Sequence, residues 1–337
     1  MNLITKIVGA IGLGLCAAAA SMPASAKDVL KPRKIGVIVI NTGSESLARW
    51  ANNIQAAAEN LHWDVIIKNG ESNPAVVSTL LPELLTQGVD AVITMAVDAP
   101  LMAQGLAEAK AKNVPVIATV VGVNPAGRDS FTAVYALNDY DLGVALADYL
   151  VQKNPKAVAV GQTATLVYAA DQLVVGAKDT LEKRGGKMAA VTDDDVTNLV
   201  NSFTQTATDL ALAHPDASAL ISCCDFAPPI DLPALKAAHR EDITLMTRYD
   251  NPSSIQAMRA GANLVVAAAR TDSYNLAALD VLVDHFSKQT PIPNALPDLT
   301  SDIKVIDKAS IPASGEVYPF AAELAQHVER WTKEHQF

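Results

Sequence analysis

The chain has 337 residues, with 26 basic and 36 acidic side chains and a formal charge of −10 at pH 7. This acidic balance argues against a nucleic-acid partner, because contacts to phosphates need basic patches. The length is too great for one compact core and favours two domains.

The first 26 residues have the features of a secretory signal peptide. Lys6 precedes the apolar run "IVGAIGLGLCAAAA", and the small residues "ASA" at 24–26 suit a signal peptidase. The run is shorter than the roughly 20 residues that cross a bilayer. We therefore expect cleavage after Ala26, a periplasmic protein, and a mature charge of −11, because the removed segment holds one Lys and no acid. A lipoprotein acylated at Cys16 stays an alternative, although Leu15 fits it poorly.

The first half of the mature chain alternates apolar strands with helices. Strands are expected at 34–40, 63–69, 89–95 and 114–121, and helices at 46–61, 73–88 and 99–113. Asn73 can cap the second helix, Pro74 suits its first turn and Gly88 ends it. Because the strands are apolar throughout, we expect a parallel sheet covered by helices on both faces.

The same pattern repeats in the second half. Strands are expected at 157–163, 187–194, 217–223 and 243–250, and helices at 138–154, 171–185, 199–215 and 232–240. The tail holds a helix at 273–289, a Pro-rich extended stretch at 290–307 and an amphipathic helix at 320–335. This organisation predicts two doubly wound α/β domains of one design. We assign 34–136 and about 272–302 to the N-terminal domain, and 137–271 and about 303–337 to the C-terminal domain.

The sequence contains no familiar catalytic motif. There is no G-x-S-x-G, no Walker A loop and no H-E-x-x-H, and the six histidines are scattered. The glycines at 9, 12 and 14 lie in the expected signal peptide, so they form no dinucleotide loop. We therefore expect a protein that is not an enzyme and that uses no cofactor and no metal ion.

Five segments point to a known family. "KIGVIVI", "LLTQGVDAVITMAVDAP", "AKAKNVPVIATV", "LAHPDASALI" and "SSIQAMRAGANLVVAAAR" stand in an order and spacing that resemble the type I periplasmic binding proteins of the ribose/galactose class. These are substrate-binding subunits of ABC transporters, and the resemblance covers nearly the whole mature chain. It implies two domains joined by a multi-strand hinge. A monomer of this kind captures a small molecule in the cleft and delivers it to an inner-membrane permease.

Two questions of function stay open at this point. The family favours a sugar or a sugar-like polyol as ligand, and an anionic or less polar small molecule is the alternative. A sensory protein that presents its ligand to a chemoreceptor or a histidine kinase would use the same cleft as an importer subunit.

Ligands of open parallel sheets bind beyond the carboxyl ends of the strands. That position and the resemblance together give the candidate ligand contacts Asn41, Ser44, Glu45, Trp50, Val120, Tyr168, Asp171, Cys224, Asp225, Asp250 and Arg270.

The candidates depart from the family pattern in the first domain. Ser46 and Leu47 stand where sugar binders have stacking aromatic residues, and Trp50 either replaces those aromatics or packs in the core. Val120 and Val121 replace an Asp-Arg pair that binds sugar hydroxyls in the family. Bidentate charged hydrogen bonds contribute much to such recognition, so this departure weakens the case for an ordinary pyranose, while a sugar or sugar-like polyol stays favoured.

In the second domain the match is mixed. Asp250 fits a ligand-binding Asp of the family, although it can instead cap the helix that Pro252 begins. Arg270 falls about where the family has a binding Gln, and it would suit an anionic ligand or form an interdomain salt bridge. Tyr168 and Asp171 follow the strand "AVAVGQT", where the family supplies a further polar contact.

The adjacent pair Cys223 and Cys224 ends a buried strand, and Cys224–Asp225 stands in place of the family's Asn-Asp. A zinc site is disfavoured because the two thiols lack nearby His or Cys partners, and the Cys-x-x-Cys spacing of redox enzymes is absent. Two alternatives stay open. One is a vicinal disulfide, strained because neighbouring Cα atoms are only about 3.8 Å apart. The other is two free thiols, with Cys223 in the core and Cys224 on the cleft wall.

Overall fold

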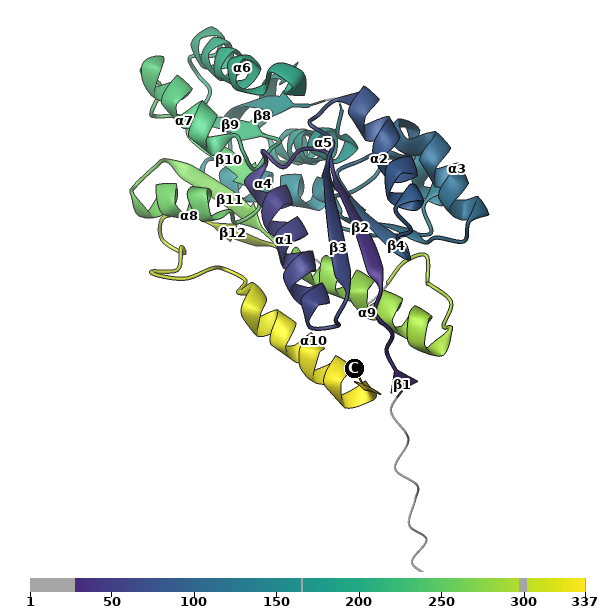
Figure 1. Ribbon diagram of the computed structural model, residues 1–337. Helices are drawn as coiled ribbons and strands as arrows, with labels where there is room; N and C mark the ends of the chain where they lie inside the picture. Colours follow the sequence, from purple (N-terminus) through teal and green to yellow (C-terminus); the bar gives the residue numbers. More distant parts are fainter. Residues whose placement is uncertain (1–27, 165, 297–301, 337) are drawn as a thin grey trace, which may run out of the picture.

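Two separate β-sheets, each with helices on both faces, form the body of the molecule (Figure 1). The structure is a computed structural model that describes residues 28–164, 166–296 and 302–336. The expected signal peptide, its cleavage site after Ala26 and Cys16 lie outside the described residues.

The first sheet has five parallel strands in the order β3–β2–β4–β5–β6. Its strands are β2 (Lys34–Val39), β3 (Asp64–Asn69), β4 (Ala91–Met95), β5 (Val116–Val120) and β6 (Ala133–Ala136). Its connections hold α1 (Glu45–Glu59), α2 (Pro74–Thr86), α3 (Ala103–Ala111) and the short turns η1 (Ala99–Met102) and η2 (Pro125–Ser130). The side chain of Asn73 caps α2 by accepting a 2.9 Å hydrogen bond from Ala75 N, as its place in the sequence predicts. The short edge strand β6 was not among the expected strands.

The second sheet repeats this design with the order β8–β7–β9–β10–β11–β12. Its strands are β7 (Val158–Thr163), β8 (Lys187–Asp193), β9 (Ala219–Ser222), β10 (Thr244–Arg248), β11 (Leu264–Ala268) and β12 (Lys304–Ile306). Its helices are α4 (Asp139–Lys153), α5 (Tyr168–Arg184), α6 (Leu199–Ala213), α7 (Pro228–Ala237) and α8 (Pro252–Arg259), with the turn η3 (Val196–Asn198). Only β12 runs antiparallel to its neighbour among the described strands of this sheet. The first five strands of each sheet follow the doubly wound order 2-1-3-4-5, which confirms the predicted fold class.

Helices α4 and α5 pack at unusually short range, and two glycines permit this. Gly143 of α4 lies against the backbone of Leu173, and Gly176 of α5 lies against the backbone of Tyr140. A Cβ atom at either position would overlap the other helix. This contact fixes α5, which begins at the cleft, against the helix that connects the domains.

The C-terminal tail passes from the first domain to the second and back to the first, which differs from the expected division of the chain. Helix α9 (Asp272–Lys288) packs on the first sheet, and β12 adds to the second sheet. Helix α10 (Phe320–Glu334) then packs on α9 and α1 of the first domain rather than on the C-terminal domain to which 303–337 was assigned (Figure 1). The reason is the apolar side of α10, where Trp331 is buried and donates a 2.7 Å hydrogen bond to Asp280 on α9.

The two ends of the described chain meet at the same place. Strand β1 (Asp28–Val29) pairs in parallel with β13 (His335–Gln336), beside α10 (Figure 1). Both ends therefore belong to the first domain.

No helix among the described residues has the length and apolar character needed to cross a membrane.

Candidate ligand-binding site

A cavity lies where the carboxyl ends of the two sheets face each other. The first domain contributes residues that follow β2, β4 and β5, and the second contributes residues that follow β7 and β9 or end β10. This is the position at which doubly wound sheets bind ligands. The volume open to the centre of a water molecule is about 50 Å³. One water needs about 10–15 Å³ by that measure, so the cavity has room for a few waters or one small molecule.

Apolar side chains dominate the wall of this cavity. The described lining residues are Ile40, Asn41, Ser44, Leu47, Trp50, Ser72, Ala96, Val121, Ala164, Val167, Val196, Leu199, Cys224, Asp225, Phe226, Arg248 and Tyr249. Twelve of these seventeen are apolar or aromatic, and the polar minority is Asn41, Ser44, Ser72, Asp225 and Arg248.

Asp225, which follows β9, connects the two domains across the cavity. Its Oδ2 accepts hydrogen bonds from Ser44 Oγ at 2.9 Å and from Ser46 N at 3.3 Å, both at the start of α1 in the first domain. Within the second domain, Asn251 Nδ2 donates to the same oxygen at 2.8 Å, and Ser46 Oγ donates to Asn251 Oδ1. The start of α1 is therefore bonded to the ends of β9 and β10. We call Ser44, Ser46, Asp225 and Asn251 the interdomain latch.

A buried ion pair lies beneath the cavity. Arg248 ends β10 and donates to Asp139, the first residue of α4. Asp139 also accepts from Tyr249 Oη at 3.0 Å and from Gly122 N at 3.1 Å. Burial raises the pKa of Asp139, and the charge of Arg248 opposes that shift. Burial also raises the pKa of the Tyr249 phenol well above its usual value, so this hydroxyl stays protonated and donates.

Trp50 forms an aromatic wall between the cavity and the segment that connects β11 to α9. Its side chain is fully buried and lies edge-on to Tyr249 with ring centroids 5.0 Å apart. Its indole Nε1 donates a 2.9 Å hydrogen bond to Thr271 Oγ1, in the crossing from β11 to α9. Trp50 therefore lines the cavity and is packed in the interior, and its stacking on a ligand stays a prediction.

Cys223 and Cys224 are joined by a vicinal disulfide, with Cα atoms 3.7 Å apart. Cys223 is fully buried, and Cys224 lines the cavity. The carbonyl oxygen of Cys224 accepts a 2.9 Å hydrogen bond from Thr247 Oγ1 on β10. The bonded pair thereby fixes the start of the loop that carries Asp225.

The backbone is strained at three strand ends around the cavity. Ala96 follows β4, Val120 ends β5 and Tyr249 follows β10, and their φ angles are +58°, +62° and +64°. This left-handed region is unfavourable for non-glycine residues and most unfavourable for β-branched ones such as Val120. Such strain concentrates at functional sites, so the three positions support a binding role for this edge of the sheets.

The structure brings five of the predicted contacts together and disperses the others. Asn41, Ser44, Trp50, Cys224 and Asp225 line the cavity. Val120 is buried directly beside the lining residue Val121. Glu45 instead accepts from Ser253 N and Oγ across the domain boundary, at 3.3 Å from the amide to each carboxylate oxygen.

Three further candidates lie outside the lining of the cavity. Tyr168 begins α5, and its amide donates to Asp98 of the first domain at 3.4 Å. Asp171 is exposed one turn later. Arg270 lies away from the cavity: its guanidinium is 3.8 Å from the carboxylate of Asp302 and lies over the ring of Tyr318.

Asp250 lies behind the cavity wall, in an interdomain group of charges. It is 6% exposed, and Arg49 of α1 is its cationic neighbour. Arg49 also pairs with Asp272 at 3.5 Å. Burial raises the pKa of Asp250 to about 6, while Arg49 opposes the shift and Asp272 and Glu316 add to it.

Several lining residues were missed in the sequence. Ser72 and Phe226 lie in turns, Val196 begins η3 and Leu199 begins α6, and their positions at the cavity depend on the tertiary packing. Arg248 did have a signal, because it is a lone charge in the otherwise uncharged strand "ITLMTRY".

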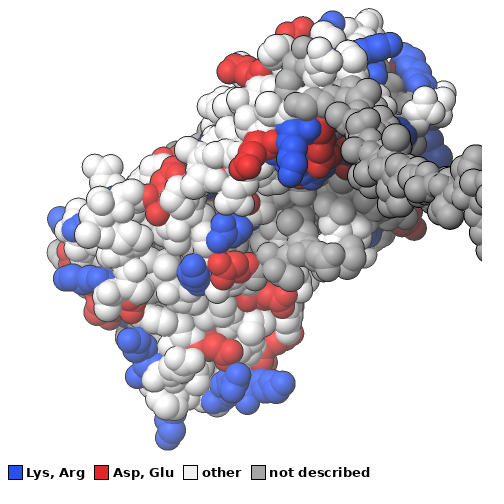
Figure 2. Space-filling model, turned by 90° about the horizontal axis from the view of Figure 1, so that it is seen from below, with Lys and Arg blue, Asp and Glu red and all other residues white. Residues whose placement is uncertain are grey.

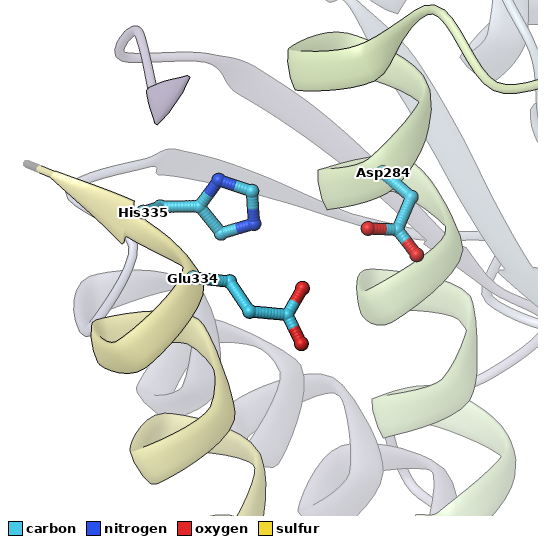
Figure 3. Close-up of side chains that lie close together, drawn as sticks. All are labelled: Asp284, Glu334 and His335. Carbon is cyan, nitrogen blue, oxygen red and sulfur yellow. The ribbon is translucent and has the colours of Figure 1, made fainter. Parts of the chain in front are cut away.

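A second group of ionisable side chains joins α9 to α10. Figure 3 shows the side chains of Asp284, Glu334 and His335 close together, with their candidate ligand atoms within 4.8 Å of one another. Lys288 Nζ already binds both carboxylates at 3.0 Å, and Arg330 lies within 3.4 Å of each. The group is therefore an ion-pair network that fastens the tail. On the face seen from below, basic and acidic side chains are likewise interspersed (Figure 2).

The comparisons with known proteins agree with this architecture. Residues 35–290 match the family described as periplasmic binding protein domain. A xylitol-binding protein of Mycolicibacterium smegmatis is 32% identical over 131 residues, which cover 35% of this chain and 34% of that protein. The chain thus matches only about a third of the length of this relative.

Solved structures share the fold at low sequence identity. A Mycobacterium smegmatis protein in complex with β-D-fucofuranose is 17% identical with a TM-score of 0.73, covering 88% of this chain and 98% of that chain. The binding component of an arabinose ABC transporter from Shewanella sp. ANA-3 is 16% identical with a TM-score of 0.72, covering 90% and 99%. A solute-binding protein of Actinobacillus succinogenes with bound D-allose is 16% identical with a TM-score of 0.72, covering 83% and 98%.

Proposed function

The chain belongs to the periplasmic binding protein domain family, and on this premise we propose that it is the substrate-binding subunit of an ABC importer. It captures a small molecule between its domains and delivers it to a permease in the inner membrane. The observation that carries the proposal is the cavity at the facing carboxyl ends of the two sheets, with the interdomain latch joining its two walls. One chain supplies both walls of the cavity, which supports action as a monomer.

The geometry supports capture by hinge closure. The chain crosses between the domains at 137–138 and at 269–271, and Thr271 in the second crossing is hydrogen-bonded to the cavity residue Trp50. When the domains separate, the bonds from Ser44 and Ser46 to Asp225 break and the cavity opens to solvent. A ligand that contacts both walls shifts this equilibrium to the closed form, which a permease can recognise.

The relatives support a hydroxyl-bearing ligand as the starting class. Sugars and xylitol are the molecules named for the proteins that this chain resembles. The alternatives are an anionic ligand and a less polar one.

The same cavity would serve a sensory protein that presents its closed form to a chemoreceptor or a histidine kinase. The sensory function stays an alternative because the geometry supports closure of the two domains around a ligand, and both functions need that closure. Deleting the gene and comparing uptake with signalling output separates the two: loss of uptake supports the importer, and loss of signalling with intact uptake supports the sensor.

We further propose that the protein has no catalytic activity. The ionisable groups at the cavity are engaged with other protein groups, Asp225 in the interdomain latch and Arg248 with Asp139. A turnover assay with a bound ligand tests this, and product formation would contradict it.

Binding is tested on the mature protein by thermal shift with a small-molecule library and by native mass spectrometry of protein from its own periplasm. At a ligand concentration 100 times Kd, a single site stabilises the folded state by about 2.7 kcal/mol. We expect a ligand of micromolar or tighter affinity. The absence of any ligand in both measurements would overturn the proposed function.

A further inference from the structure

We propose that the ligand is a small uncharged molecule with an apolar body and no more than two hydroxyl groups, bound with a hydroxyl against Asp225 and Arg248. This inference rests on the proposed function and narrows the class of its ligand. It departs from the sugars and polyols named for the relatives, and the reasons lie in the wall of the cavity.

The polar side chains at one end of the cavity are already bonded to each other. Asn41 Nδ2 donates to Ser72 Oγ at 3.0 Å, and Asn41 Oδ1 accepts from Gly43 N at 2.7 Å. Ser44 Oγ donates to Asp225 and also accepts from Leu47 N at 3.3 Å, as the cap of α1. These bonds use the hydroxyl proton of Ser44 and one N–H of Asn41, so fewer polar groups are left for the several hydroxyls of a polyol.

Asp225 keeps one oxygen for a ligand. Each hydrogen bond that described residues donate to its carboxylate ends on Oδ2, and Asp225 lines the cavity. Oδ1 is thus the acceptor that a ligand hydroxyl can use. Arg248 also lines the cavity, and its hydrogen bonds to described residues, Asp139 and the carbonyl of Ala169, both come from Nη1.

The charges of Asp225 and Arg248 favour an uncharged polar group on the ligand. The charge of Arg248 is matched by Asp139, so a carboxylate ligand would meet Asp225 without a free cation among the described lining residues. An ammonium group can donate to Asp225 but cannot accept from Arg248. A hydroxyl does both, because it carries one donor and two acceptor lone pairs.

The rest of the wall disfavours additional hydroxyls. Away from Asp225 and Arg248, a ligand in this small cavity would meet mainly apolar side chains, among them Val121, Leu199 and Phe226. A hydroxyl buried there without a partner loses its hydrogen bonds to water. We expect each such hydroxyl to weaken binding by about five-fold to a hundred-fold.

A series of six-membered rings tests the inference by isothermal titration calorimetry on the mature oxidised protein. The probes are cyclohexanol, myo-inositol, cyclohexylammonium and cyclohexanecarboxylate, with xylitol as the open-chain polyol. We expect cyclohexanol to bind at least ten-fold more tightly than any other probe. If myo-inositol, xylitol or either charged ring binds as tightly as cyclohexanol, the inference is overturned while the proposed function stands.

One variant adds a polar group to the cavity wall, and a control variant makes the same change at an equally buried position outside the wall. Val121 lines the cavity directly after β5, whereas Val116 begins that strand outside the cavity lining, and both are 2% exposed. Val121→Thr adds a hydroxyl to the wall, so we expect the affinity ratio of myo-inositol to cyclohexanol to rise at least five-fold. Val116→Thr should leave that ratio unchanged. Equal ratios in both variants would contradict the inference, because the wall would then not select against hydroxyls.

If no probe binds, native mass spectrometry of the protein from its own periplasm decides. A bound molecule with one or two hydroxyls and an apolar body supports the inference, and one with three or more hydroxyls or a charge overturns it. If no molecule is bound either, the proposed function fails and this inference fails with it.

Discussion

Ser44 at the start of α1 donates a 2.9 Å hydrogen bond to Asp225 beyond β9, so the carboxylate that faces the cavity also holds the domains together. One oxygen of Asp225 serves the latch and the other is open to a ligand. Under the proposed function, ligand binding and domain closure are thereby linked through a single side chain. This relationship makes closure measurable without knowledge of the ligand.

Ser44→Ala should shift the protein toward an open form, because the variant loses the hydrogen bond to Asp225. Small-angle scattering should show a larger radius of gyration than for the wild type, and Ser44→Thr should restore the compact value. Ser44 is also a helix cap, so we expect a loss of about 1–2 kcal/mol in the free energy of unfolding. Asn73→Ala removes the cap of α2 without an interdomain bond and serves as the control. An equal expansion in both alanine variants would exclude the latch as its cause.

Trp50→Phe should abolish most of the change in tryptophan fluorescence that accompanies ligand binding. Trp50 is one of three tryptophans and lines the cavity, whereas Trp63 packs against Phe286 and donates to Lys31 O at 3.2 Å. Trp63→Phe should therefore keep the ligand-dependent signal. The loss of the bond to Thr271 should also lower the free energy of unfolding by about 1–3 kcal/mol. A signal that persists in Trp50→Phe would place the ligand elsewhere.

Asp139→Asn should destabilise the protein by about 3–5 kcal/mol, because it leaves Arg248 buried without its counter-charge. Urea unfolding measures this loss. Asp141→Asn changes an exposed carboxylate in the same first turn of α4 and should alter the free energy by less than about 0.5 kcal/mol. Similar losses in the two variants would show that the helix terminus, and not the ion pair, is what matters.

The free energy of unfolding should fall as pH rises from about 4 to 6, in part because of Asp250. Its pKa is raised to about 6 in the folded protein, so between the unfolded value and pH 6 the folded state binds more protons than the unfolded state. The full shift corresponds to about 3 kcal/mol. Asp250→Asn should reduce the slope of stability against pH in this window, while the raised pKa of Asp272 keeps part of it. Identical slopes in wild type and variant would disprove the contribution.

A dithiol reductant should open the disulfide, so the protein gains two hydrogen atoms. Intact mass spectrometry measures this increase. Alkylation of Cys223 and Cys224 should require prior reduction, because the disulfide occupies both sulfur atoms. Reduction frees the loop that carries Asp225, so ligand affinity should fall about five-fold. A double Cys→Ser variant that matches the reduced protein in affinity would show that the bond, and not the sulfur atoms, positions the loop. Equal affinity before and after reduction would contradict this role.

The fold was predictable because its strands are short, apolar and separated by helices. The parallel order follows from that alternation, and the sheets confirm it. The place of α10 was not predictable in the same way. The sequence of an amphipathic helix shows that one side is apolar but not which domain will cover that side. In the structure, Trp331 is hydrogen-bonded to Asp280 on α9.

The cavity was predictable only near the strands that end at its centre. Asn41 and Cys224–Asp225 follow β2 and β9, which lie within their sheets beside the point where the strand order reverses, so position alone identified them. Arg270 follows β11, which lies between β10 and the edge strand β12, and it therefore points to a different region. The partners of Asp225 were also hidden, because hydrogen bonds between residues about 180 positions apart leave no local pattern.

The parallel pairing of Asp28 and Val29 with His335 and Gln336 has a practical consequence for single-molecule work. A handle attached at either end would hold the same domain and leave the other free to rotate. Such immobilised molecules could report opening through a dye on the second domain. Because the ends are neighbours, they could also be joined by a short linker, and new ends placed in an exposed loop would give a circular permutant with the same two lobes.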